Sequence, residues 1–200
     1  LTGSIPADLG NAKYIGGIDV RNNFLTGPIP SSIGQLSRLG RLLLRYNNIS
    51  SSIPDSLGNC VSLGQMLSLE YNKLTGTIPP SLGNFTQLEL LSLHSNQLNG
   101  SIPSSFAKLN KLYTLNVSDN LLTSTIPSAV GNLSKLAYLL VSHNKLSGSI
   151  PPIGNLYGGQ DSITYIDVST NRISGYIPNS LCETSNLLVD VSNTDITCYT

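Results

Sequence analysis

Apolar residues recur along this chain in short alternating runs that return at a fixed interval. In the run Leu91-Ser92-Leu93, and again at Leu115 and Val117 one interval later, every second residue is apolar. This alternation has the period of a β-strand with one buried face. Each run covers about four residues, and Pro and Gly interrupt the chain before an ordinary amphipathic helix could form. The pattern therefore predicts one short strand in every interval, with turns between the strands.

An Ile-Pro dipeptide and an asparagine repeat in phase with these strands. The successive Ile-Pro spacings are 24, 24, 25, 24, 24, 24 and 27 residues. A single unit of this length cannot bury its apolar side chains, whereas stacked units form a continuous core. We therefore predict a single domain over residues 1–200, built from about eight repeats of 24 residues. The dipeptides begin at Ile5, Ile29, Ile53, Ile78, Ile102, Ile126, Ile150 and Ile177, and the asparagines are Asn23, Asn47, Asn72, Asn96, Asn120, Asn144 and Asn171.

The repeating leucines, isoleucines and asparagines are predicted to point into the stack. Each asparagine side chain is expected to hydrogen-bond the backbone that leaves the strand, in its own coil and in the next one. Buried backbone groups without such partners would each cost about 1–3 kcal/mol. Cys60 falls in a core column and should be buried as a small apolar residue. Its counterparts in other repeats are Leu36, Phe85, Leu109 and Leu133.

The repeats share the consensus LxxLxLxxNxLxGxIPxxLGxL. With its LTGxIP segment, this pattern resembles the plant-specific class of leucine-rich repeats, shared by receptor-like kinase ectodomains, receptor-like proteins and polygalacturonase-inhibiting proteins. The resemblance covers nearly the whole chain and implies an α/β-type leucine-rich-repeat solenoid. Such a solenoid is a right-handed curved stack with a short parallel β-sheet on its concave face. A second set of short strands lies beside that sheet, and short 3₁₀ turns and loops form the convex face.

The two ends of the chain depart from the repeat. The chain starts in the middle of a motif that recurs later, and the family's paired-cysteine N-terminal cap is absent, so we expect an N-terminally truncated chain. After Asn171 the asparagine column ends, because Thr194 takes the next position. Residues 182–200 are therefore predicted to form a C-terminal cap. We predict a disulfide there between Cys182 and Cys198, which close a loop of about 17 residues, worth about 3 kcal/mol in the chain-entropy model.

Composition narrows the classes of function. The net charge is zero and charged residues make up 11% of the chain, which argues against a nucleic-acid partner and against polybasic contact with a membrane. No apolar run reaches the roughly 18 residues of a membrane span. The motifs of serine hydrolases, zinc proteases, nucleotide-binding loops and kinases are absent, so we expect neither an enzyme nor a cofactor. A kinase domain would lie outside this chain.

The histidines do not suggest a metal site. The chain has two, His94 and His143, which lie two residues and one residue before a ladder asparagine and are two coils apart. Two steps across a parallel sheet separate them by about 10 Å, which is too far for one metal ion without a third ligand between them. We therefore expect no bound metal, and solvated surface histidines instead.

The outward positions of the predicted strands provide the candidate binding site. Strand alternation turns them onto the concave face, and in the N-terminal half they carry tyrosine and arginine, which are enriched at binding hot spots. We expect Arg45 to pair with Glu70, and Arg21 to be free to share an anionic group of a ligand. Tyr46 and Tyr71 should form a stacked apolar wall beside them. The alternative is an ordinary surface ion pair next to a solvated arginine. The candidate residues are Arg21, Arg45, Tyr46, Glu70, Tyr71 and His94.

Five N-glycosylation sequons fit an extracellular or cell-surface location. Two of them share one repeat phase on the convex turns, where a glycan would do no harm. The sequon at Asn116 faces the concave side, where a glycan would block half of the surface. The candidate glycosylation sites are Asn48, Asn84, Asn99, Asn116 and Asn132.

These observations predict an extracellular module that binds a protein or peptide ligand and makes no membrane contact of its own. It resembles the ligand-binding ectodomain of a plant receptor-like protein or receptor kinase, and a co-receptor is expected as a further partner. Two alternatives remain open. One is an inhibitor of a secreted hydrolase, similar to polygalacturonase-inhibiting proteins. The other is an ice-binding protein, because outward hydroxyl pairs such as Thr75 and Thr77 precede most of the Ile-Pro dipeptides and would form a flat array.

Overall fold

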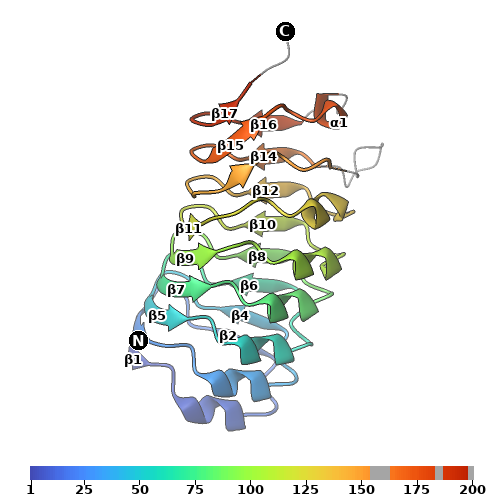
Figure 1. Ribbon diagram of the computed structural model, residues 1–200. Coiled ribbons are helices and arrows are strands. Elements are labelled where there is room, and N and C mark those ends of the chain that lie inside the picture. Colours follow the sequence, from blue (N-terminus) through green and yellow to red (C-terminus); the bar gives the residue numbers. More distant parts are fainter. Residues whose placement is uncertain (154–162, 183–186, 198–200) are drawn as a thin grey trace.

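The computed structural model describes residues 1–153, 163–182 and 187–197. These residues form a curved stack of coils, one coil for each repeat (Figure 1). A coil contributes a strand to a main parallel sheet, and most coils add a short 3₁₀ helix and a strand to one of two lateral sheets, β1 to β11 (2–122) or β13 to β17 (147–196). The predicted leucine-rich-repeat solenoid is therefore confirmed. Within the described ranges, no helix has the length and apolar character needed to cross a membrane.

The main sheet has eight parallel strands in chain order and forms the concave face. Its neighbours pair residue for residue at the interval of one repeat, as in Leu42 with Leu67 and Leu67 with Leu91. Equivalent side chains therefore stack in columns across the sheet. The strands are β2 (Gly17–Asp19), β4 (Arg41–Leu43), β6 (Met66–Ser68), β8 (Leu90–Ser92), β10 (Thr114–Asn116), β12 (Tyr138–Leu140), β14 (Tyr165–Asp167) and β16 (Leu188–Asp190).

The lateral strands are also parallel, but their register differs from that of the main sheet. Ser4 pairs with Thr26 and Thr77 pairs with Asn99, so that partners lie two residues short of a full repeat. Each lateral strand is consequently displaced by two residues relative to its neighbour. The strands are β1 (Thr2–Ser4), β3 (Phe24–Gly27), β5 (Asn48–Ser52), β7 (Lys73–Thr77), β9 (Gln97–Gly100), β11 (Leu121–Leu122), β13 (Ser147–Gly148), β15 (Arg172–Gly175) and β17 (Asp195–Ile196).

Short 3₁₀ helices follow the Ile-Pro dipeptides and stack along the convex side (Figure 1). The proline directly before each of them has a φ between −70° and −60°. Because proline has no N–H to donate, it ends the pairing of the lateral strand at this point. The helices are η1 (Ala7–Asn11), η2 (Ser31–Gln35), η3 (Asp55–Asn59), η4 (Pro80–Asn84), η5 (Ser104–Lys108) and η6 (Ser128–Asn132), and α1 (Asn179–Cys182) follows the last Ile-Pro dipeptide.

A glycine in the 3₁₀ turn allows successive coils to approach closely. At Gly34, in η2, an added Cβ would lie 2.2 Å from the backbone oxygen of Ser56 in the next coil. Such a contact is far inside van der Waals distance, and its partner is a backbone atom that cannot move cheaply. The glycine of the repeat consensus IPxxLGxL therefore permits this close approach at Gly34. Two repeats carry Ala107 and Cys182 at the same position, so the requirement does not extend to every coil.

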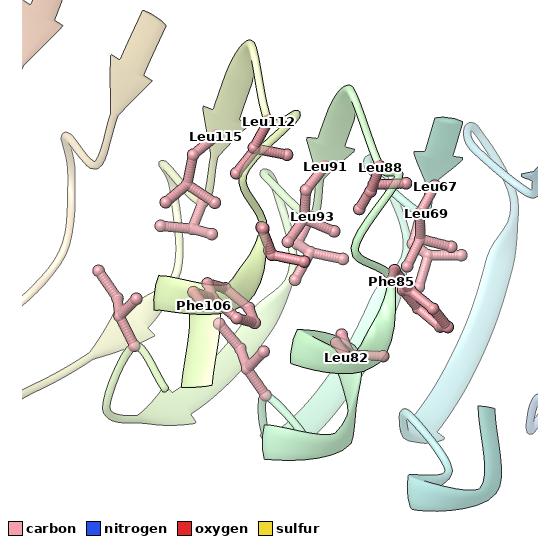
Figure 2. Packing of buried hydrophobic residues seen from close by; sticks show 14 of the residues in the cluster. Leu67, Leu69, Leu82, Phe85, Leu88, Leu91, Leu93, Phe106, Leu112 and Leu115 are labelled. Atoms are coloured by element: carbon pink, nitrogen blue, oxygen red, sulfur yellow. The ribbon is translucent and has the colours of Figure 1, made fainter. Parts of the chain in front are cut away.

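The interior is one cluster of buried apolar side chains that runs through the stack from Leu25 to Leu181, with partly buried residues packed against it at both ends. Figure 2 shows leucines from the main strands, such as Leu91 and Leu115, pointing toward Phe85 and Phe106 at the 3₁₀ turns. Both phenylalanines are fully buried. The cluster confirms that the repeats share a continuous core.

Cys60 lies in this core, as predicted. Its side chain is 0% exposed, and its thiol donates a hydrogen bond to the carbonyl of Ile33 at 3.1 Å. Burial raises the pKa of the Cys60 thiol above its ordinary value. Because the thiolate is the reactive form of cysteine, Cys60 is a structural residue.

The asparagine ladder forms as predicted, except for its direction. The Asn47 side chain donates to the carbonyls of Leu44 at 2.9 Å and of Val20 at 3.0 Å, and accepts from the amide of Leu25 at 3.0 Å. Val20 and Leu25 belong to the preceding coil, so the expectation that each asparagine reaches into the next coil is wrong. Every ladder asparagine from Asn72 to Asn171 repeats this arrangement.

The predicted disulfide cannot be compared with the structure, because Cys198 lies outside the described residues and nothing is described of the Cys182 side chain. The cap over residues 182–200 is described only in part. Within it, β16 extends the main sheet and β17 extends the lateral strands. Thr194 takes the ladder position there, and its hydroxyl donates to the carbonyl of Val191.

Candidate functional site

The concave face presents four columns of side chains, set by the register of the main sheet. Two columns come from the first and third residues of each strand. The other two come from the second and third residues after each strand. The first of these contains Arg21, Arg45, Glu70, His94, Ser118, Ser142, Ser169 and Ser192, and the second contains Asn22, Tyr46, Tyr71, Ser95, Asp119, His143, Thr170 and Asn193.

The column that contains Tyr46 and Tyr71 has an unusual backbone. All eight of its residues have positive φ, between 50° and 56°. Backbone hydrogen bonds between coils hold this conformation, as in Tyr46 N–H to the Glu70 carbonyl at 3.1 Å and Tyr71 N–H to the His94 carbonyl at 3.1 Å. The left-handed conformation is costly for non-glycine residues, and it turns each coil away from the main sheet at the same point. The side chains of this column therefore line the edge of the concave face in regular order.

Two tyrosines and a histidine form a continuous aromatic cluster in the N-terminal half. The rings of Tyr46 and Tyr71 are stacked, with centroids 4.3 Å apart and an angle of 9° between the planes. Tyr71 then meets His94 edge-on at 4.8 Å. Both tyrosines stay exposed, at 47% for Tyr46 and 43% for Tyr71. Desolvation, and next the neighbouring Tyr71, raise the pKa of the Tyr46 phenol. The predicted tyrosine wall is therefore present as a preformed apolar surface.

The predicted ion pair between Arg45 and Glu70 lies beside this wall. Arg45 Nη1 is 3.6 Å from Glu70 Oε1, and the arginine carbon Cζ is 6.0 Å from the centre of the Tyr46 ring. Glu70 is only 5% exposed, and the Ser68 hydroxyl lies 2.8 and 2.9 Å from its two carboxylate oxygens. The Nε of Arg45 is buried and has no hydrogen-bond partner among the described residues. Glu70 therefore anchors the arginine, whose side chain stays 38% exposed.

The expectation that Arg21 is free for a ligand anion is wrong. Its Nε and Nη2 donate to the two carboxylate oxygens of Asp19, each at 2.8 Å. The hydrogen bond from Arg21 lowers the pKa of the Asp19 carboxyl, and Asp19 raises the pKa of the guanidinium in turn. The partner lies two residues earlier on the same strand, at the neighbouring outward position. Arg41, exposed on the next strand, is a cation near this pair that the sequence-based site did not include.

His94 and His143 lie in different columns and do not face each other. The Nδ1 atom of His94 lies 3.1 Å from the hydroxyl of Ser95. Burial lowers the pKa of His94, and Glu70 and Asp119 partly oppose that effect. Across the described ranges, no group of three or more His, Cys, Asp or Glu side chains is placed to hold a metal ion.

The lowered pKa of His94 predicts a specific dependence of stability on pH. As the pH falls below about 6.5, the unfolded chain takes up a proton at this residue while the folded chain does not. The free energy of unfolding should therefore decrease as the pH falls from 7.5 to 5. Urea denaturation of the His94→Gln variant should show a shallower decrease than the wild type over this range. A His143→Gln variant is the control, and equal slopes for wild type and His94→Gln would contradict the prediction.

The sequons occupy different surfaces. Asn84 and Asn132 are exposed at the ends of η4 and η6 on the convex side, and Asn99 is exposed on the lateral strand β9. Asn48 is half-buried at the start of β5. The Asn116 side chain, on the concave face, accepts hydrogen bonds from the amide and the hydroxyl of Ser118. Glycosylation at all five positions remains a prediction.

Two leucine-rich-repeat family models match the chain, one over residues 86–146 and the other over residues 17–36, 38–60, 65–85 and 162–184. Solved structures with the same fold include plant receptors. A TDR receptor is 32% identical, with a TM-score of 0.85 over 100% of this chain and 33% of the receptor chain. The ectodomain of the Arabidopsis receptor kinase HAESA, in complex with an IDA peptide hormone ligand that is lengthened at its N-terminus, is 32% identical, with a TM-score of 0.84 over 98% of this chain and 32% of that one. This chain belongs to the plant-type leucine-rich-repeat proteins.

A plant ice-binding protein has the same fold as well. It is 28% identical, with a TM-score of 0.72, and the match covers 98% of this chain and 70% of that protein. No curated protein sequence matches this chain. The chain spans about a third of the length of the receptor ectodomains, so the activities of those whole proteins do not transfer to it directly.

Proposed function

We propose that this chain is an extracellular recognition module that binds a peptide on its concave face, as part of a receptor-like protein. The observation that carries this proposal is the exposed aromatic cluster of Tyr46, Tyr71 and His94 beside the guanidinium of Arg45. Its rings are held in place before any ligand arrives, so little conformational entropy is lost on binding. Aromatic and arginine side chains of this kind dominate binding energies at protein interfaces.

The structural neighbours support a peptide as the ligand. The HAESA ectodomain was solved with a peptide hormone, and in another structure together with the co-receptor SERK1. A further neighbour is a plant peptide hormone receptor in complex with RGF2. By analogy, we propose that an extended peptide crosses the strands of the main sheet here, and that a co-receptor joins the complex. The chemistry is recognition rather than catalysis.

A selection experiment tests this proposal without a known ligand. Random decapeptides displayed on their messenger RNA are selected on the immobilised chain, and the enriched sequences are synthesised with a fluorescent label. Tyr71→Ala should weaken their binding at least tenfold in fluorescence anisotropy, because it removes the centre of the aromatic cluster. The matched control is Tyr176→Ala, which removes a tyrosine of similar exposure, 47%, next to the lateral strand β15. Failure to enrich any peptide sensitive to Tyr71→Ala would overturn the proposal.

Ice binding is a second candidate, favoured by the match to the plant ice-binding protein. The displaced register of the lateral strands counts against it. Because of that displacement, Ser50 lies opposite Lys73 and Thr75 lies opposite Gln97, so hydroxyls do not form uninterrupted rows across the strands. Thermal hysteresis of ice growth in the presence of the purified chain distinguishes this candidate from peptide recognition.

A further inference from the structure

The charges of the concave face are sorted along the stack. In the four columns, the cationic side chains of the described residues all belong to the first two strands and the residues after them: Arg21, Arg41 and Arg45. Two carboxylates, Asp19 and Glu70, accompany them and form the two ion pairs. From β10 to β16, the same columns carry three carboxylates, Asp119, Asp167 and Asp190, and no lysine or arginine. The face is therefore cationic toward one end and anionic toward the other.

Two of these carboxylates lie side by side. Asp167 and Asp190 are partners in the register of β14 and β16, so their Cα atoms are about 5 Å apart. Each is half-buried and accepts a hydrogen bond from the amide two residues later, Ser169 at 3.0 Å and Ser192 at 2.9 Å. In the described part of the chain neither makes an ion pair. Two like charges at this separation repel each other unless a cation is shared between them.

Tyrosines flank the carboxylates in the adjacent column. Tyr165 is on the same strand as Asp167, and Tyr138 is its partner on β12. Desolvation raises the pKa of the Tyr165 phenol, and the charges of Asp167 and Asp190 add to this effect. Both carboxylates therefore act on the same phenol group. An aromatic surface beside two carboxylates suits the long aliphatic stem and charged head of a lysine or arginine.

The separation of the two charged ends matches a short peptide. Five steps across the main sheet lead from β4 to β14, which is about 24 Å at about 4.8 Å per step. An extended peptide rises about 3.4 Å per residue, so about seven residues cover this distance. The aromatic cluster around Tyr71 lies between the two ends, nearer to Arg45.

We propose that the concave face binds an extended peptide in one orientation, with a carboxylate against Arg41 and Arg45 and a lysine or arginine, about seven residues away, against Asp167 and Asp190. This inference rests on the proposed peptide-binding function and adds the class and the direction of the peptide. The half-exposed side chain of Arg45 and the exposed Arg41 take the carboxylate, and the two aspartates, which make no ion pair with a described residue, take the cation. A peptide bound in the reverse direction would place like charges together at both ends, which disfavours it.

The displayed decapeptides test this proposal through the charges that selection enriches. Sequences selected on the wild type should carry an acidic residue and a lysine or arginine about seven positions apart. Selection on the double variant Asp167→Lys, Asp190→Lys should replace that basic residue by an acidic one and retain the first acidic residue. Wild-type-selected peptides should bind this variant at least tenfold more weakly. The control Asp195→Lys, which makes one such charge reversal on the lateral strand β17, should alter neither selection nor affinity.

A second library, attached through its amino end, separates the two sources of the carboxylate. If enrichment requires a free carboxyl terminus, the arginines bind the terminal carboxylate of the peptide. If enrichment persists with an amidated terminus, they bind an acidic side chain. Selected peptides that depend on Tyr71 but carry no paired charges would overturn the orientation and leave the proposed function standing. The absence of any Tyr71-dependent peptide would overturn both. Circular dichroism of each variant confirms that it is folded before selection.

Discussion

Replacing Asn120 by alanine should lower the free energy of unfolding by about 1–3 kcal/mol. The Asn120 side chain is 6% exposed, and its amide group donates to the carbonyls of Leu93, Val117 and Ser118 at 3.0–3.2 Å. Its oxygen accepts from the amide of Leu98 at 2.9 Å. Alanine leaves the Leu98 amide without a protein partner, between two coils that pack directly on each other. The three carbonyls each lose one of two hydrogen bonds, because they also accept from Asn96, Asn144 and the Ser95 amide. Each unsatisfied buried group costs about 1–3 kcal/mol, and water that enters the site recovers part of that loss.

Urea denaturation followed by circular dichroism measures this effect. The matched control is Asn110→Ala, which makes the same substitution at an exposed position of the preceding convex turn. The control should change the free energy of unfolding by no more than about 0.5 kcal/mol. Because contacts in a solenoid are mainly between neighbouring repeats, hydrogen exchange should also show the loss of protection concentrated in the coils around Asn120. Equal stability of the two variants would show that the ladder contributes little.

Gly34→Ala should destabilise the fold by roughly 2–4 kcal/mol, although it adds a single methyl group. The new Cβ would lie 2.2 Å from the carbonyl oxygen and 2.8 Å from the carbonyl carbon of Ser56. Because both are backbone atoms of the next coil, relief requires the coils to move apart and opens the packing of the core between them. Thermal denaturation of the variant measures the loss as a lower Tm.

Gly16→Ala is the control variant for this prediction. At Gly16 an added Cβ would meet no atom within 4 Å, and the φ of this residue lies outside the left-handed region. Alanine there restricts the unfolded chain and should leave the stability unchanged or raise it by up to about 1 kcal/mol. Similar Tm values for the two variants would mean that the spacing between coils is not the reason for the consensus glycine.

The part of the site that could be predicted from the sequence is the part that depends on the repeat alone. Arg45 and Glu70, like Tyr46 and Tyr71, are separated by exactly one repeat unit of their region, and the main sheet pairs residues at that same interval. Any two outward side chains at this interval become neighbours, so both contacts follow from counting. The burial of Cys60 follows from the same column argument.

The predictions failed for contacts that the length of the repeat does not determine. The pairing of Arg21 with Asp19 runs along one strand, whereas the prediction compared residues across coils. Each asparagine reaches into the preceding coil, and the spacing of the asparagine column is the same for either direction. The ring of Tyr138 contacts Tyr113, 5.5 Å away and in the preceding coil, although Tyr165 on the next strand is its partner in the register of the main sheet. Side-chain torsions, which no repeat pattern encodes, decide that choice.

The backward reach of the asparagine ladder has a consequence for how the molecule is made. A chain grows from its amino end during synthesis and can fold as it emerges. The amide of Leu98 obtains its partner only when Asn120, in the following coil, is in place. Each newly folded coil therefore completes the hydrogen bonds of the coil made just before it. The last coil to emerge from the ribosome is always incompletely hydrogen-bonded. A stalled or shortened chain always ends in a coil whose strand exit is open to water.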